Sequence, residues 1–184
     1  MFRHLFFLVL FFASLATSGQ PVMISKSAEI TFFSEAPVEN IEAKNNSVNS
    51  IVNTNTGEIA FMVSIRGFKF EKELMQEHFN EKYMESDKFP QATFKGKILD
   101  SLDWTKDGVY PVTATGTLTI HGIEKAVTEK ASLEIKGKEM RLSGQMLVAI
   151  ADYNISIPKL LFQNIADTIK VQLKSDYVPY QKKN

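Results

Sequence analysis

A strict two-residue alternation between residues 110 and 135 is the feature that most constrains the fold. From Tyr110 to Ile120 the even-numbered side chains are apolar or small, whereas most odd-numbered ones carry hydroxyl groups. After a break at residues 122–125 the alternation resumes, with Leu133 and Ile135 on the apolar side. A period of two turns one face of a strand towards a core and the other towards water. Two such strands in succession predict an antiparallel sheet with one solvated face.

One charged side chain departs from this pattern in the second run. Glu129 falls on the apolar phase, between Val127 and Ala131, whereas the neighbouring Lys130 falls on the polar phase. The alternation therefore predicts a carboxylate on the inner face of the sheet.

The rest of the chain supplies more strands of the same kind. Alternation and turn residues predict them at residues 28–33, 47–53, 58–70, 92–99, 140–150 and 169–177. In the 58–70 strand the apolar phase slips by one position at Arg66-Gly67, which is typical of a β-bulge at a bend. Residues 34–46 contain Pro37 and several Asn and Glu, and they are predicted to form a loop.

A helical period appears only between Glu71 and Tyr83. Leu74 and His78, and likewise Met75 and Phe79, lie four residues apart, which predicts one short amphipathic helix. His78 is a candidate site residue, although a partly buried or capping role is the more ordinary explanation for a lone histidine.

About eight strands and one helix, linked mostly by short turns, predict an all-β fold with a single antiparallel eight-stranded barrel and one short helix. Long antiparallel sheets hide their edges by closing, and the bore of an eight-stranded barrel is either filled with side chains or holds one small apolar ligand. The pattern alone leaves both alternatives open.

The first 20 residues have the layout of a secretory signal peptide. Arg3 and His4 precede an apolar run from Leu5 to Leu15, and small residues follow at 16–19. The run is shorter than the roughly 20 apolar residues that span a bilayer, so an uncleaved anchor is the weaker alternative. We expect residues 1–20 to be a signal peptide, cleaved between residues 16 and 20. Residues 21–184 then form one domain of a periplasmic or secreted protein.

Composition excludes several classes of function. The 21 basic and 21 acidic residues of this 184-residue chain give no surplus of positive charge for binding nucleic acid. The chain has no Cys, and after removal of the signal peptide only His78 and His121 remain as histidines, with no metal-binding spacing. We therefore predict a protein that is not an enzyme and has no metal site.

Three segments carry a resemblance to a known family. Residues 118–127 resemble the strand–turn–strand signature of the YceI-like family, and residues 78–94 resemble its helix, aromatic-Pro step and Thr-x-Phe-like strand. The sequence from Asp152 to Ile155 is similar to the Asp-aromatic-Gly-aliphatic turn of the family, with Asn154 in place of Gly. The chain also has Ile150 where many members have Arg.

The resemblance implies an exported bacterial lipocalin-like barrel that binds a long isoprenoid, an isoprenoid quinone or a similar lipid and requires no cofactor. The implied role is that of a carrier or storage protein. Any contact with a membrane is expected to be transient, and the oligomeric state stays open, a dimer included. The alternative is an exported interaction or structural module with a filled barrel, using Leu160-Leu161-Phe162 as a contact patch; the same segment could instead cover the barrel mouth.

The predicted ligand-binding residues are the large inward side chains of the strands, although ordinary core packing would account for each of them equally well. They are Ile59, Phe61, Val63, Phe94, Val112, Leu118, Ile120, Leu133, Met146 and Val148. Small inward residues at Ala114, Gly116 and Gly144 favour a cavity but also suit a bend.

Overall fold

The structure, a computed structural model, describes residues 21–35, 40–157 and 165–181. The predicted signal peptide and the 160–162 segment lie outside the described residues. The described strands are β1 (Val22–Ser34), β2 (Ile41–Asn45), β3 (Val48–Asn53), β4 (Glu58–Ser64), β5 (Phe68–Phe70), β6 (Gln91–Ile98), β7 (Gly108–Ile120), β8 (Ile123–Lys136), β9 (Glu139–Ala149) and β10 (Thr168–Pro179).

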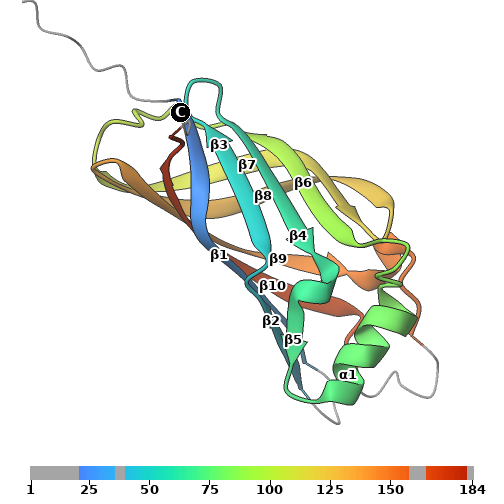
Figure 1. The fold of residues 1–184 in the computed structure, drawn as a ribbon. Helices are drawn as coiled ribbons and strands as arrows, with labels where there is room; N and C mark the ends of the chain where they lie inside the picture. The colour runs from blue at the N-terminus through green and yellow to red at the C-terminus, as the bar shows by residue number, and fades with distance from the viewer. Residues whose placement is uncertain (1–20, 36–39, 158–164, 182–184) are drawn as a thin grey trace, which may run out of the picture.

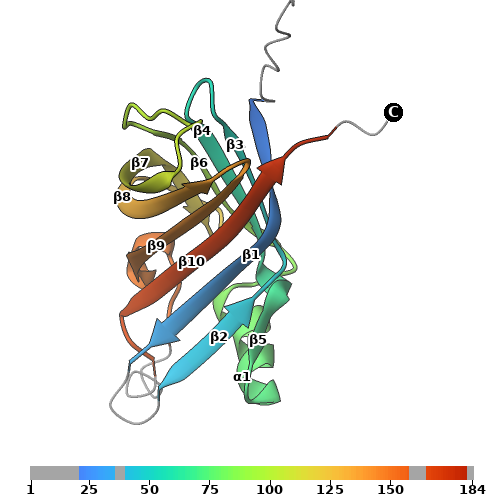
Figure 2. The ribbon, with the colours of Figure 1, turned by 90° about the vertical axis from the view of Figure 1, so that its left-hand side faces the viewer.

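The strands close into an antiparallel barrel, as predicted (Figure 1). Around the barrel the order is β10-β9-β8-β7-β6-β4-β3-β1, and β1 pairs with β10 to complete the ring of eight strands. The pairing runs from Met23 opposite Pro179 to Phe33 opposite Lys170, so the first and last strands lie side by side (Figure 2).

The predicted loop at residues 34–46 was wrong in part, because it contains β2. The long strand β1 pairs with β3 near its start and with β2 near its end, and β5 pairs with β2 as an extension of the sheet. The inner face of β2 carries Ala43 and Asn45, both fully buried. A small residue and an amide give no apolar alternation, so the strand is not visible to a hydrophobic pattern.

The phase slip in the 58–70 segment is a turn of 3-10 helix, Ile65–Gly67, that separates β4 from β5. Gly67 packs directly against Asn45, since a Cβ atom there would lie 2.4 Å from Asn45 Oδ1. The chain therefore bends at the predicted position, but by a helical turn rather than by a β-bulge.

The predicted helix is present in two parts. Helix α1 (Glu73–His78) continues into a π-helical turn, η2 (Phe79–Tyr83), which lies at one end of the barrel (Figure 1). The ring of Phe79 lies 5.0–5.5 Å from those of Phe32, Phe68 and Phe70. This aromatic contact fixes the helix to the barrel wall. In the described part of the chain, no helix is long and apolar enough to cross a membrane.

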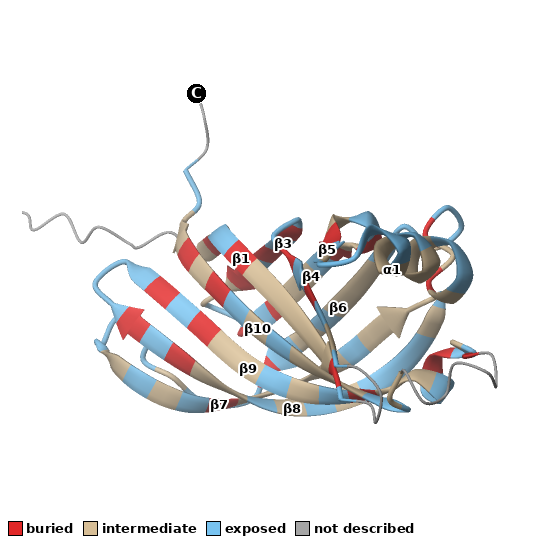
Figure 3. Ribbon diagram, turned by 90° about the horizontal axis from the view of Figure 1, so that it is seen from below, coloured by how far each residue is buried: buried red, intermediate tan, exposed pale blue. Residues whose placement is uncertain are grey.

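The barrel is filled at the end opposite the helix. The larger cluster of buried residues includes Val52, Val112, Leu133, Met140 and Tyr177, which lie on the strand ends near the start of β1 and the end of β10. Figure 3 shows bands of buried residues on β9 and β10 towards the end of β10, giving way to intermediate positions farther from this end. The interior is thus packed in one half of the barrel.

Candidate ligand cavity

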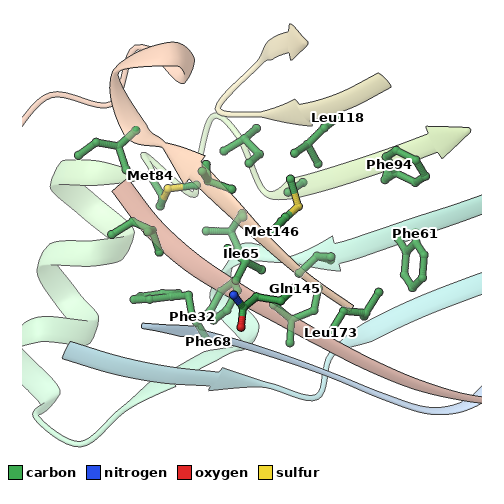
Figure 4. Close-up of a pocket in the computed structure, with 18 of the residues that line it drawn as sticks. Phe32, Phe61, Ile65, Phe68, Met84, Phe94, Leu118, Gln145, Met146 and Leu173 are labelled. Atoms are coloured by element: carbon green, nitrogen blue, oxygen red, sulfur yellow. The ribbon is translucent and has the colours of Figure 1, made fainter. Parts of the chain in front are cut away.

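The half of the barrel next to the helix contains a cavity of about 400 Å³. This volume lies within the range of roughly 300–1,000 Å³ that is usual for small-molecule sites. Most of the lining side chains are aliphatic, aromatic or thioether groups, and Figure 4 shows Phe61, Phe94, Leu118, Met146 and Leu173 among them. Such a wall offers dispersion contacts and few hydrogen bonds.

The predicted ligand-binding residues divide between the cavity and the packed half. The residues that line the cavity are Ile59, Phe61, Val63, Phe94, Leu118, Ile120, Met146 and Val148. Val112 and Leu133 instead belong to the buried cluster of the filled half, at 2% and 1% exposure. The alternation correctly orients all of these side chains inward but does not tell how far along the bore packing gives way to empty volume. Their role in binding stays a prediction.

The small inward residues serve two purposes. Ala114 and Gly144 line the cavity, where they leave room. Gly116 lies opposite Gly96, and a Cβ atom on Gly116 would be 2.3 Å from the carbonyl oxygen of Lys95. The glycine pair therefore permits a close approach of β6 and β7, which is the bend alternative.

Aromatic residues at the helix end of the cavity were not among the predicted site residues. Phe32, Phe68, Phe70 and Phe79 form one contact group and all line the cavity. The chain has 14 Phe, but a high count only indicates a large apolar interior and places none of them in a site. Assigning them to the site required knowing that the helix folds back over this end of the barrel.

Few polar residues line the cavity. They are Ser34, His78, Tyr83, Thr93, Glu129, Lys130 and Gln145. The Ser34 hydroxyl accepts a hydrogen bond from the amide of Ala166, and burial raises the pKa of the Tyr83 phenol. The remaining titratable residues in the lining are His78, Glu129 and Lys130.

Three of these polar residues lie where β8 and β9 separate. The two strands pair from Lys136 opposite Glu139 up to Ala131 opposite Gly144, and their pairing ends there. Beyond this point β8 residues 123–130 remain paired with β7, and β9 residues 145–149 remain paired with β10. Glu129, Lys130 and Gln145 flank the place where the strands part, which we call the seam, and all three line the cavity.

A histidine joins three segments at the helix end. His121 Nδ1 lies 3.1 Å from the carbonyl oxygen of Tyr153, and Nε2 lies 3.2 Å from Glu85 Oε2. Hydrogen bonding from Lys88, with a smaller contribution from His121, lowers the pKa of Glu85. His121 thus ties the segment after the helix to the β7–β8 turn and to the 3-10 turn Ile150–Tyr153. Among the described residues, no cluster of three or more His, Asp or Glu side chains could hold a metal ion.

Comparisons with known proteins agree with this architecture. The sequence matches the YceI-like domain family over residues 22–177. A polyisoprenoid binding domain from Saccharophagus degradans superimposes with a TM-score of 0.71 at 15% identity, covering 88% of this chain and 99% of that one. BcnA from Burkholderia cenocepacia gives a TM-score of 0.69 at 16% identity, over 81% and 95% of the two chains.

A third solved structure, the YCEI protein of Campylobacter jejuni, gives a TM-score of 0.63 at 15% identity, with coverage of 80% and 90%. At these low identities, the structural similarity shows a shared fold and no more. No match was found among curated proteins.

Proposed function

Because this chain belongs to the YceI-like family, we propose that it binds a long isoprenoid, an isoprenoid quinone or a similar apolar lipid in the barrel cavity, without catalysing a reaction. We further propose that it does so as an exported carrier or storage protein of the periplasm or the extracellular space. The observation that carries the binding proposal is the apolar cavity of about 400 Å³ next to the helix.

The physics of such binding requires little beyond this wall. An isoprenoid chain has methyl and methylene groups and no hydrogen bonds to satisfy along its length. Each buried methylene contributes about 0.8 kcal/mol, from which the costs of ordering the chain are subtracted. A cavity lined mainly by Phe, Ile, Leu, Val and Met side chains therefore suits an apolar chain without catalytic groups.

The alternative of a filled barrel acting as an interaction module applies to only half of the bore. The packed residues at the end opposite the helix support it there, but the empty volume at the helix end favours a ligand. The similar domain from Saccharophagus degradans is a polyisoprenoid binding domain, which points in the same direction.

Native mass spectrometry of the purified protein, followed by organic extraction, tests the proposal. We expect one extractable lipid per barrel, or uptake of one polyprenol or isoprenoid quinone by the lipid-free protein. The substitution Ala114→Phe fills the cavity and is expected to abolish uptake, whereas Thr117→Phe on the exposed face of the same strand is expected to leave it unchanged. Lipid-free protein that takes up none of these compounds would contradict the proposal.

A further inference from the structure

The seam is a polar part of the cavity wall that begins where the pairing of β8 with β9 ends, at Ala131 opposite Gly144. On its two flanks, β8 residues 123–130 and β9 residues 145–149 each bond to a neighbour on the other side only. No other described strand pairs with their remaining backbone amides and carbonyls, so these groups can bond to water or to a bound molecule. The cavity reaches both flanks, since Val127 and Glu129 line it from β8 and Gln145 and Met146 line it from β9.

Glu129 is the residue of the seam that points inward. It lies on the same face of β8 as Val127 and Ala131, directly opposite Ala114 of β7, and it is half-buried. No hydrogen bond or ion pair joins its carboxylate to any residue that the structure describes. Water reaching the half-buried carboxylate can solvate it while the cavity contains no lipid.

The other polar groups of the seam do not satisfy this carboxylate. Lys130 is exposed and belongs to the opposite, outward phase of β8. Gln145 is exposed as well, and its amide oxygen accepts a long hydrogen bond, 3.4 Å, from Gln172 Nε2. An apolar chain that fills the cavity would displace water from Glu129 and leave a carboxylate without a partner, which is costly.

We propose that the seam holds the polar end of the bound chain, and that Glu129 selects a head group that donates a hydrogen bond or carries positive charge. An alcohol or a primary amine on a prenyl chain would replace the water lost from the carboxylate. A carboxylate or phosphate head would meet a like charge, and a head with carbonyl acceptors alone would leave the carboxylate without a donor. This assignment rests on the proposed lipid binding and narrows the ligand to prenyl alcohols and amines.

Competition by native mass spectrometry tests the assignment. The lipid-free protein is mixed with equal amounts of farnesol, farnesylamine, farnesyl phosphate and a prenyl hydrocarbon. We expect the alcohol and the amine to bind about 10- to 100-fold more tightly than the phosphate, the usual range for one hydrogen bond to a charged group. Glu129→Leu is expected to remove this preference while the hydrocarbon still binds.

Two further variants separate the seam from its surroundings. Glu124→Gln alters an exposed carboxylate on the same strand and is expected to leave the preference unchanged. His78→Asn alters the polar residue that α1 contributes to the cavity and is expected to have no effect on the ranking of head groups. Circular dichroism of each variant checks that the barrel is folded.

Several outcomes would overturn the assignment. Equal binding of all the prenyl compounds, unaffected by Glu129→Leu, would refute it while leaving the proposed lipid binding intact. Tightest binding of farnesyl phosphate, lost in Lys130→Gln, would show that the seam binds acids. A ranking that changes with His78→Asn rather than Glu129→Leu would place the head group at the helix. If no prenyl compound binds, the proposed function fails and the assignment fails with it.

Discussion

Asn45 is a single residue that stabilises two bends of the sheet, namely the turn between β2 and β3 and the 3-10 turn that follows β4. Its side-chain Nδ2 donates to the carbonyl oxygen of Ser64, at the end of β4, and its Oδ1 accepts from the amide of Ser47, between β2 and β3. Both distances are 2.7 Å and the side chain is fully buried. An apolar replacement would leave backbone groups of both bends without these partners.

We therefore expect Asn45→Ala to lower the free energy of unfolding by about 2–3 kcal/mol, measured by urea denaturation. Asn49→Ala, at an exposed position of β3, serves as the matched control and is expected to change it by no more than about 0.5 kcal/mol. Equal effects of the two substitutions would show that the two hydrogen bonds do not hold the bends.

Asp176 gives a prediction about pH at the closing strands. Its carboxylate accepts a hydrogen bond from Arg141 Nε of β9 at 2.6 Å and one from the Ser27 hydroxyl of β1 at 3.0 Å. The Arg141 guanidinium in particular holds the pKa of Asp176 below its usual value. A lowered pKa in the folded state means that this contribution to stability is present above the unfolded pKa of about 3.9 and is lost as the pH falls through the folded value.

We expect Asp176→Asn to reduce the free energy of unfolding at pH 7 and to have a smaller effect as the pH falls below about 4. Denaturation curves of both proteins between neutral and acid pH measure the difference. A destabilisation that is the same at every pH would mean that the substitution acts through packing and not through charge.

At the scale of elements, period two was enough to place most strands and the direction of their side chains. It predicted β7 and β8 almost to their ends, and it placed the phase slip at Arg66-Gly67 where the structure has its 3-10 turn. It missed β2, because Ala43 and Asn45 form its inner face. It could not locate the cavity, because the boundary between packed and empty volume depends on contacts such as Phe32 with Phe79 that are remote in sequence.

The close approach of the paired strands β6 and β7 depends on two facing glycines. Gly96 and Gly116 are paired, and a Cβ atom on either would lie 2.3 Å from a backbone carbonyl oxygen of the other strand. We expect Gly116→Ala to lower the free energy of unfolding by about 3 kcal/mol, because backbone must move apart. Gly144→Ala is the comparison: its Cβ would meet the Ala131 side chain at 3.2 Å, so a loss of about 1 kcal/mol is expected in thermal or urea unfolding.

At the scale of the whole molecule, the barrel consists of a packed half, opposite the helix, and a hollow half next to the helix. A ligand in the hollow half binds the folded state alone, since the cavity does not exist in the unfolded chain. At a free concentration of one hundred times its Kd, such a ligand adds about 2.7 kcal/mol to the free energy of unfolding. Thermal unfolding with increasing farnesol should show a rising Tm in the native protein and a constant Tm in Ala114→Phe.

The pairing of β1 with β10 also determines how late the molecule can complete its fold. Met23 meets Pro179, so the contact that closes the ring joins residues almost a full chain length apart, and contacts of such high sequence separation slow folding. Until the last strand has docked, β1 and β9 each present an unpaired edge that another chain can extend. A newly made molecule is therefore most exposed to aggregation just before its final twelve-residue strand is in place.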